Sequence, residues 1–266
     1  MKDRFGREIN YLRVSVTDRC NLRCRYCTPA EGVTLLPQDK ILSYEEILDV
    51  VVEAAALGVT KVRLTGGEPL VRRDIVRLVQ MLAGVEGIKD LCMSTNGILL
   101  QEYSQPLADA GLQRVNVSLD AISPPRYRYI TRGGDVSQVL AGIGAAREAG
   151  LEPVKLNCVV EDSADEPDAR AVARFGEQND LPVRFIPRMD LQEGTFSTII
   201  GGTGGECDTC NRLRLSADGF IRPCLFSDLA YSVRKLGAAQ ALKTAVRNKP
   251  RRGTDCEDCY MRRIGG

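Results

Sequence analysis

The sequence predicts an α/β fold in which parallel strands alternate with helices. Six short β-rich runs lie between residues 11 and 187, helical periodicity fills the intervals, and no internal repeat beyond this alternation is present. Repeated strand–helix units imply parallel strands joined by right-handed crossovers. Six units suit either a doubly wound sheet or a partial (β/α) barrel, and in both folds the active site lies at the carboxyl ends of the strands.

The elements follow in a regular order along the chain. Strands are predicted over residues 12–16, 61–64, 91–94, 114–117, 153–159 and 183–186, and helices over residues 44–57, 74–82, 104–110, 136–149 and 167–178. The first helix begins with a capping box, in which Ser43 is the N-cap and Glu46 stands three residues later. Gly58 and Gly150 stand where the C-terminal glycines of the first and fourth helices belong.

The alternation ends after residue 190. Residues 192–206 are rich in Gly and Thr and are predicted to form a loop, and the segment from Cys207 onward is rich in Cys and Arg. We therefore expect a main domain over residues 1–190 and a small appendage over residues 191–266, which ends in Gly265 and Gly266.

The composition is that of a folded protein with balanced charge. Of 266 residues, 44% are hydrophobic and 27% charged, which is the composition of a folded globular protein rather than of a disordered chain. The net charge of +1 gives no argument for a nucleic-acid or membrane partner. The charged N-terminal segment lacks the apolar run of a signal peptide, and no stretch approaches 18 apolar residues. We expect a cytoplasmic protein whose thiols stay reduced.

Two residue counts restrict the chemistry. The chain has no His, which excludes Ser–His and Cys–His nucleophilic pairs and any metal site with a His ligand. It has 10 Cys, most of them grouped, and grouped Cys in a reduced protein indicate metal or redox chemistry rather than disulfides. Cys92 and Cys158 fall in predicted strands and are expected to pack as small hydrophobic residues.

Two groups of three Cys are candidate metal ligands. Cys20, Cys24 and Cys27 follow the first predicted strand, and three thiolates in so short a loop can hold a 4Fe–4S cluster with one iron left open. The second group is Cys207, Cys210 and Cys224. Arg212 and Arg214 lie between its members and suit an anionic substrate, because guanidinium binds phosphate in a bidentate manner. A zinc site remains the alternative for each group.

The first Cys group together with Gly66–Gly67–Glu68–Pro69, after the second strand, resembles the radical S-adenosylmethionine (SAM) superfamily. The stretches YLRVSVTDRCNLRCRYC, KVRLTGGEPLVRRDI, RVNVSLDAI, ITRGGD, PVKLN, VRFI and CNRLRLSADG, with the Gly–Gly tail, resemble the GTP 3′,8-cyclase family of molybdenum cofactor biosynthesis. This resemblance covers nearly the whole chain, in order. It implies a partial (β/α)6 TIM-type barrel of the radical SAM class with a small C-terminal cluster-binding appendage.

The resemblance implies two 4Fe–4S clusters and SAM as cofactors. The first cluster falls on Cys20, Cys24 and Cys27, the second on Cys207, Cys210 and Cys224, and the SAM contacts on Tyr26, Gly67, Ser118 and Met189. Read without the resemblance, Ser118 and Met189 are more simply residues that pack at strand ends.

The resemblance also implies GTP as substrate. The GTP contacts fall on Arg13, Arg63, Ser94, Lys155, Arg212, Leu213 and Arg214, and the catalytic residues on Arg212, Arg214, Gly265 and Gly266. The simpler interpretations are that Arg13 and Lys155 lie at exposed strand edges and that the Gly–Gly tail is a frayed terminus.

The implied reaction begins when an electron from the first cluster cleaves SAM. The resulting 5′-deoxyadenosyl radical removes hydrogen from ribose C3′, and the carbon radical attacks guanine C8 while the second cluster holds the purine. The product is 3′,8-cyclo-7,8-dihydro-GTP, and the reaction is the first step of molybdopterin biosynthesis. The implied partners are GTP, an electron donor such as flavodoxin or ferredoxin, a downstream enzyme of the same pathway and, in a homodimer, a second copy of the chain.

Four features depart from the family's pattern. Only 16 residues separate Asp190 from Cys207, several tens fewer than in the family, so a wall of the substrate cavity is expected to be missing. Pro187–Arg188 stand where the family has an acidic and then an apolar residue, and Ser94 replaces Thr. Cys256 and Cys259 form an extra pair. One of them could supply a fourth ligand to a cluster, or the two could be a redox pair, a separate metal site or spare thiols.

Two other functions stay open at this point. One is a divergent two-cluster radical SAM enzyme that acts on another nucleotide or on a peptide, which the short linker and extra Cys pair favour. The other is a non-catalytic metal-binding interaction protein. The set of basic residues favours a nucleotide, and therefore the cyclase.

Overall fold

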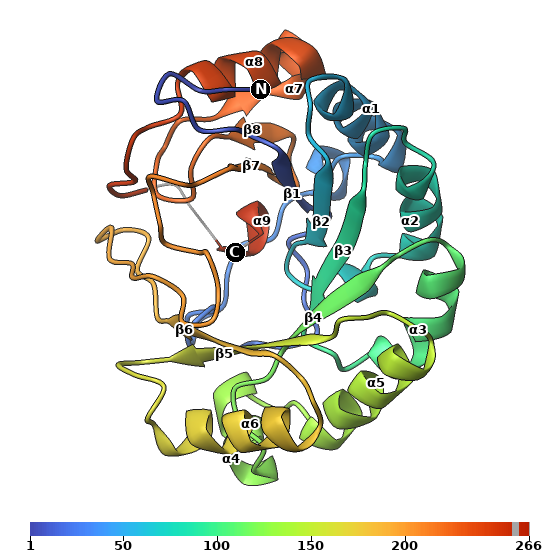
Figure 1. Cartoon of the computed structure of the whole chain (residues 1–266), viewed down its shortest axis with the longest axis vertical. Coiled ribbons are helices and arrows are strands. Elements are labelled where there is room, and N and C mark those ends of the chain that lie inside the picture. Colours follow the sequence, from blue (N-terminus) through green and yellow to red (C-terminus); the bar gives the residue numbers. More distant parts are fainter. Residues whose placement is uncertain (257–260, 266) are drawn as a thin grey trace.

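The computed structural model describes residues 1–256 and 261–265. Within them, the strands form one nine-stranded sheet in the order β6-β5-β4-β3-β2-β1-β7-β8-β9 (Figure 1). The strands are β1 (Tyr11–Ser15), β2 (Lys61–Thr65), β3 (Asp90–Thr95), β4 (Arg114–Ser118), β5 (Lys155–Val160), β6 (Val183–Pro187), β7 (Arg212–Leu215), β8 (Phe220–Arg222) and β9 (Tyr231–Ser232).

The order of the strands distinguishes the two predicted folds. From β1 to β6 each strand pairs in parallel with the next one along the chain. A doubly wound sheet reverses its strand order at a switch point, whereas a barrel does not. The fold is therefore the partial (β/α) barrel, in which the sheet curves around an open interior (Figure 1).

Helices cover the outer face of this curved sheet (Figure 1). They are α1 (Tyr44–Ala56), α2 (Ile75–Ala83), α3 (Leu100–Asp109), α4 (Pro124–Thr131), α5 (Val136–Glu148), α6 (Pro167–Gln178), α7 (Val233–Leu236) and α8 (Ala238–Arg247), with short 3₁₀ turns η1 (Gln38–Lys40) and η2 (Pro69–Val71). Helix α9 (Met261–Ile264) is not part of this outer layer. The apolar faces of α1 to α8 pack on the strands in one hydrophobic core, and Ile264 of α9 belongs to a second, smaller cluster. None of the described helices is long and apolar enough to cross a bilayer.

The predicted six strands and five helices are present. The capping box of α1 is confirmed, since the Glu46 amide donates to Ser43 Oγ at 3.1 Å and the Ser43 amide donates to the Glu46 carboxylate at 2.7 Å. Helix α3 begins at Leu100 rather than residue 104, because the buried face of the helix extends to Leu100. Helix α4 is missing from the prediction, although Ser123 followed by Pro124 is a typical helix start.

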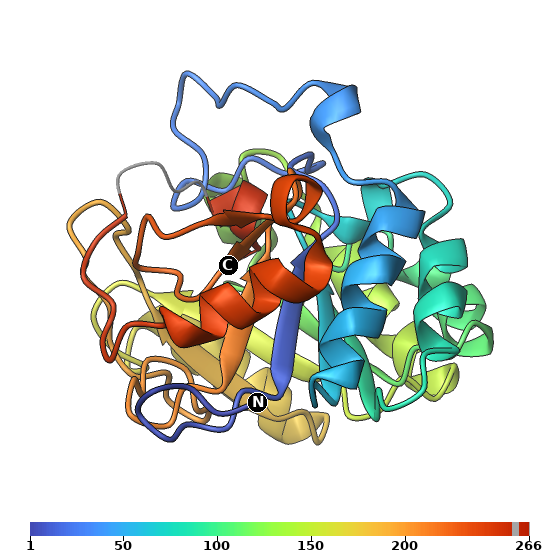
Figure 2. The ribbon, with the colours of Figure 1, turned by 90° about the horizontal axis from the view of Figure 1, so that it is seen from above.

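The segment after residue 206 continues the main sheet. Strand β7 pairs in parallel with β1, and β8 and β9 follow in antiparallel order. Helix α8 packs against α1 and crosses the face seen in Figure 2, and α9 lies inside the curve of the barrel (Figures 1 and 2). The division between residues 1–190 and 191–266 stays a prediction.

Candidate functional site

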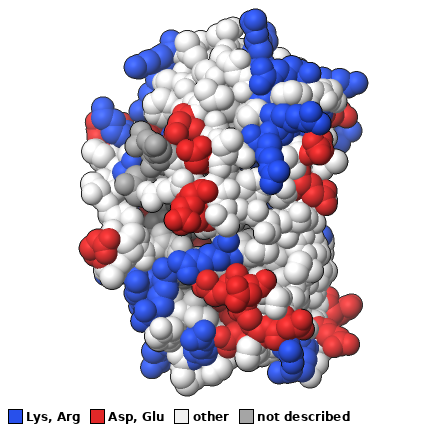
Figure 3. Space-filling view, turned by 90° about the vertical axis from the view of Figure 1, so that its left-hand side faces the viewer, with Lys and Arg blue, Asp and Glu red and all other residues white. Residues whose placement is uncertain are grey.

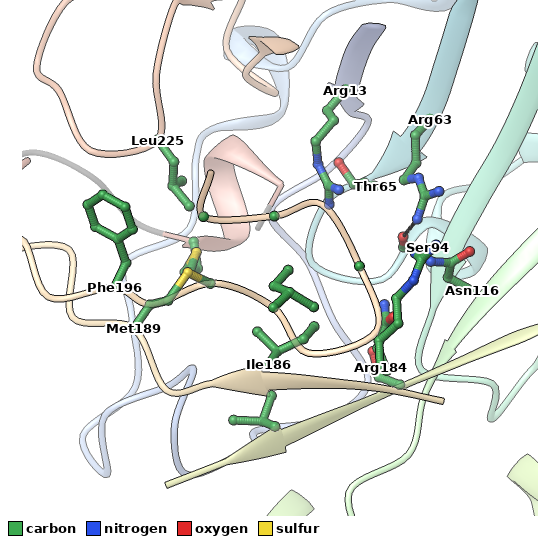
Figure 4. A pocket seen from close by; sticks show the side chains of 18 of the residues that line it. Arg13, Arg63, Thr65, Ser94, Asn116, Arg184, Ile186, Met189, Phe196 and Leu225 are labelled. Atoms are coloured by element: carbon green, nitrogen blue, oxygen red, sulfur yellow. Dashed lines mark hydrogen bonds between the residues drawn. The ribbon is translucent and has the colours of Figure 1, made fainter. Parts of the chain in front are cut away.

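A cavity of about 480 Å³ opens at the carboxyl ends of the strands. Both Cys groups line it, as do basic residues from four strands. Figure 4 shows Arg63, Ser94, Asn116 and Arg184 gathered on one side, and Met189, Phe196 and Leu225 on the other. The cavity is therefore polar and basic on one flank and apolar on the opposite flank.

The first Cys group lies in the loop after β1. Burial raises the pKa of the Cys24 thiol to about 12, and the charges of Asp120, Cys27 and Cys20 act in the same direction. The C-terminal end of α4 supports this loop, because the Arg23 amide donates to the Thr131 carbonyl at 3.2 Å. A buried thiol such as that of Cys24 needs a cationic partner to become a thiolate, and iron supplies that charge. Figure 2 shows the chain after this loop projecting beyond the barrel.

Gly67 is required by the path of the backbone. A Cβ at this position would collide with the Arg19 carbonyl oxygen of the Cys loop. The Gly67 amide donates to the Thr17 carbonyl at 2.7 Å, and the next amide donates to the Arg19 carbonyl at 2.8 Å. Glycine is therefore needed at this position for the close packing of the turn against the Cys loop, in addition to any need for a ligand to approach the backbone.

Glu68 joins the turn after β2 to the end of β3. Its buried carboxylate accepts from Thr95 Oγ1 at 2.7 Å, from the Asn96 amide at 2.6 Å and from the Leu70 amide at 3.1 Å. Burial raises its pKa to about 7, although these donors favour the charged form.

Tyr26, one of the predicted SAM contacts, is fixed by a buried carboxylate. Its hydroxyl donates to Asp120 Oδ2 at 2.8 Å, and the Val159 amide donates to Asp120 Oδ1 at 2.9 Å. Burial raises the pKa of Asp120 to about 6. Ser118 and Met189 also line the cavity. Sequence reasoning missed Asp120, although the quoted stretch RVNVSLDAI contains it.

The second Cys group lines the same cavity as the first. Cys207, Cys210 and Cys224 all line the cavity, and the Cys210 amide donates to the Cys207 carbonyl at 3.2 Å. Burial raises the pKa of the Cys210 thiol, but Lys249 and Arg212 outweigh it, and the net pKa lies below the ordinary value. Within the described residues, no three Cys, Asp or Glu side chains are grouped as ligands of a single metal ion.

Three arginines form a row across neighbouring strands. Arg13 on β1 is in register with Arg63 on β2 and with Arg214 on β7. Burial, together with the charges of Arg13 and Arg212, lowers the pKa of Arg214 to about 9. Packing like charges together in a buried place is unfavourable unless an anion neutralises them. The arginine row therefore indicates a binding site for an anion.

The hydrogen bonds of the Arg63 guanidinium group also leave room for an anion. Its Nη1 donates to Ser94 Oγ at 3.3 Å. When the side-chain amide of Asn116 is oriented with its oxygen toward the arginines, that oxygen accepts hydrogen bonds from Arg63 Nη1 at 2.6 Å and from Arg184 Nη1 at 3.1 Å. Arg63 Nε is buried and has no hydrogen-bond partner in the described residues. Arg184 and Asn116 were missed by sequence reasoning, although both fall within the predicted strands.

Two of the predicted GTP contacts are not brought to the cavity wall. Lys155 and Leu213 are absent from its described lining. Leu213 is fully buried, because side chains alternate along β7 and its neighbours Arg212 and Arg214 take the cavity face. Lys155 lies at the start of β5, where burial and the charge of Arg184 lower its pKa.

The C-terminal tail reaches the arginine row. The Gly265 carbonyl accepts from Arg13 Nε at 3.2 Å and from Arg214 Nη1. Gly265 has φ of +74°, and a Cβ would collide with Thr65 Oγ1. A frayed terminus is therefore wrong for Gly265, while Gly266 lies outside the described residues.

The remaining Cys residues divide into two kinds. Cys92 and Cys158 are buried in strands, as predicted. Cys256 is buried and disulfide-bonded, so the expectation of reduced thiols is wrong at this position. Cys259 lies outside the described residues.

The short linker after Asp190 does form part of the cavity wall. Two β-bridges anchor it, Phe185 to Ile200 and Asp190 to Thr195. The Phe196 ring stacks on Phe226 with centroids 4.4 Å apart, and Phe196 lines the cavity.

Comparison with known proteins identifies the family. The sequence model of the Radical SAM superfamily matches residues 14–175. GTP 3′,8-cyclase of Thermodesulfovibrio yellowstonii is 40% identical over an alignment of 293 residues, which covers 93% of this chain and 91% of that protein. GTP 3′,8-cyclase of Alkaliphilus oremlandii is 38% identical over 320 residues, which covers both chains completely. That alignment exceeds the 266 residues here, so the relative carries segments that this chain lacks.

Solved structures support the same fold. Native anSMEcpe with bound AdoMet and Kp18Cys peptide has a TM-score of 0.63 at 15% identity, over 91% of this chain and 81% of that one. Methylornithine synthase (PylB) has a TM-score of 0.57 at 21% identity, over 72% of this chain and 57% of that one. At these identities the likeness concerns the fold alone. From the sequence relatives, the chain belongs to the GTP 3′,8-cyclase family of the radical SAM superfamily.

Proposed function

We propose that this chain converts GTP to 3′,8-cyclo-7,8-dihydro-GTP. The observation that carries the proposal is the row Arg63–Arg13–Arg214, which lies in one cavity with two separate Cys groups. A row of guanidinium groups that line one cavity is suited to a triphosphate, since each fork binds phosphate oxygens in a bidentate manner.

The first Cys group fits a 4Fe–4S cluster with SAM. Cys20, Cys24 and Cys27 would hold three irons of a 4Fe–4S cube. Each thiolate binds a different iron, so the three sulfur atoms need not converge on a single metal ion. When bound, this pair of cofactors supplies the radical that removes hydrogen from the ribose. Asp120 holds Tyr26 beside the cofactor position, and Gly67, Ser118 and Met189 would complete the SAM site.

The second Cys group fits another 4Fe–4S cluster in the same cavity. Cys207, Cys210 and Cys224 would hold it, and its open iron would face the purine. The cavity residues then act on the substrate from two directions. Arg13, Arg63, Ser94, Arg212 and Arg214 hold the phosphates, and Phe196 and Met189 exclude water from the reacting carbon.

The tail would orient the arginines rather than react. Arg13 and Arg214 both donate to the Gly265 carbonyl, which fixes the direction in which each guanidinium points. Lys155 and Leu213, which the resemblance also assigns to GTP, would act only by supporting neighbours. The disulfide-bonded Cys256 is left out of the second cluster's ligand set.

Partners follow from the chemistry. Radical generation needs a low-potential electron donor, such as flavodoxin or ferredoxin, and the reactive product needs a downstream enzyme. The cluster thiolates require the reducing surroundings of the cytoplasm. A homodimer stays part of this proposal.

Figure 3 shows acidic and basic side chains interspersed over one face, as the net charge of +1 leads one to expect.

The test is anaerobic reconstitution with SAM, dithionite and GTP, followed by analysis of the product. We expect the cyclic nucleotide, and iron and sulfide near eight of each per chain, since each cube holds about four of each. The variant with Cys20, Cys24 and Cys27 changed to Ala should retain about four irons and lose SAM cleavage. SAM cleavage without GTP cyclisation, but with conversion of another nucleotide, would favour the divergent-enzyme alternative suggested by the short chain.

A further inference from the structure

Lys249, which follows α8, is a buried cation beside the second Cys group. It is 1% exposed, and its Nζ donates to the Arg212 carbonyl at 2.7 Å and to the Pro223 carbonyl at 2.5 Å. Arg212 stands two residues after Cys210, and Pro223 immediately precedes Cys224. The ammonium group therefore joins the two loops that carry these cysteines.

Among the residues that the structure describes, Lys249 has thiol neighbours but forms no ion pair with a carboxylate. Its side chain hydrogen-bonds the Cys210 thiol, and Cys224 and Arg7 are its other charged neighbours. Within the described residues, none of the ion pairs involves Lys249. Burying an ammonium group without a counter-charge is costly, so the geometry calls for an anion at the Cys group.

Arg7, the cationic neighbour of Lys249, is itself paired with a buried carboxylate. Asp3 Oδ2 accepts from Arg7 Nε at 2.6 Å, and both side chains are buried. Arg7 in turn donates to the Cys207 carbonyl at 2.6 Å, to the Pro250 carbonyl at 2.6 Å and to the Arg251 carbonyl at 3.0 Å. The N-terminal segment thus fixes the backbone on both sides of the second Cys group and next to Lys249.

We propose that Lys249 is the built-in counter-charge of the second 4Fe–4S cluster and raises its reduction potential. This inference rests on the proposed function, which supplies the cluster. A 4Fe–4S core of charge +2 with three thiolates has a net charge of −1, and one electron makes it −2. A fixed positive charge in contact with a ligand thiolate stabilises the more negative state, so reduction becomes easier.

The test is an EPR-monitored redox titration of the second cluster in the full chain. The variant with Cys20, Cys24 and Cys27 changed to Ala identifies which signal belongs to that cluster. Lys249→Gln keeps a donor for the two carbonyls and removes the charge, Lys249→Met removes both, and Lys249→Arg keeps the charge. Lys243→Gln, on the exposed face of α8, is the matched control.

We expect Lys249→Gln and Lys249→Met to keep about eight irons and to lower the potential of the second cluster. The equilibrium constant for one-electron reduction should fall by about tenfold, equivalent to about 59 mV. Lys249→Arg and Lys243→Gln should stay near the parent. If the Gln and Met variants lose the second cluster and the Arg variant keeps it, the result also supports a role for the positive charge at position 249.

Two results would overturn the inference. An unchanged potential in a Gln variant with both clusters would show that the charge does not act on the cluster. Loss of the second cluster from all three Lys249 variants would assign the side chain to packing alone. A parent protein with about four irons and no second signal would instead contradict the proposed function itself.

Discussion

At the scale of single residues, the arginine row is expected to lower the stability of the fold while it binds the substrate. Arg63 is 4% exposed, its Nε is buried without a partner, and it stands in register with Arg13. Replacing buried ion pairs by apolar side chains of similar volume is often neutral or stabilises a protein by about 1–4 kcal/mol, and Arg63 has no acidic partner among the described residues whose attraction would be lost.

Arg63→Met is therefore expected to raise the melting temperature of the cluster-free protein and to raise the KM for GTP at least about tenfold, the equivalent of one lost charge-assisted contact. Thermal unfolding and steady-state kinetics check the two effects separately. Arg174→Met, on α6 away from the described cavity lining, is the control. A lower melting temperature with unchanged KM would mean that Arg63 serves the fold.

Glu68 gives a pH dependence whose sign is fixed by its burial. Burial raises its pKa from 4.5 to about 7 in the folded chain, so between these values the folded state binds the additional proton. Its contribution to stability is complete below about pH 4.5 and is lost as the pH rises through about 7. The free energy of unfolding of the parent should fall across this window relative to Glu68→Gln. Urea titrations at several pH values measure it, with the exposed Glu45→Gln as control.

At the scale of elements, the N-terminal segment is expected to hold the second Cys group in place. Arg7→Ala removes the hydrogen bonds to the Cys207, Pro250 and Arg251 carbonyls and leaves Asp3 buried without its partner. Breaking a buried pair in this way costs about 3–5 kcal/mol. We expect loss of the second cluster with retention of the first, measured as iron content and EPR signal. Arg4→Ala, which is exposed, should keep both clusters.

The elements also show what a sequence pattern can and cannot predict. The strands of the barrel alternate with amphipathic helices, so local periodicity was sufficient to place β1 to β6 and the capping box of α1. Strand β7 is only four residues long and is defined by its long-range pairing with β1, which no local pattern contains. The same limit applies to the site. The Cys spacing indicated both groups, but Lys249 and Asp120 matter because of contacts made far along the chain.

At the scale of the whole molecule, one sheet runs through both predicted domains. Strand β1 has β2 on one side and β7 on the other, so the segment after residue 206 covers what would otherwise be an open edge. Arg13 and Arg214 become neighbours only through this pairing. The row of arginines, and with it the proposed phosphate site, is therefore a property of the complete sheet rather than of either predicted domain.

This arrangement predicts the outcome of separating the two parts at residue 190. A chain of residues 1–190 keeps Cys20, Cys24 and Cys27, but it exposes the backbone donors and acceptors of β1 along an apolar strand. Unpaired edges of this kind promote association between chains. We expect the fragment to aggregate, and co-expression with residues 191–266 to restore a monodisperse species with two clusters. Size-exclusion chromatography and iron analysis measure both. A monomeric fragment with a stable first cluster would show that residues 1–190 fold independently, as the domain prediction in its simplest form requires.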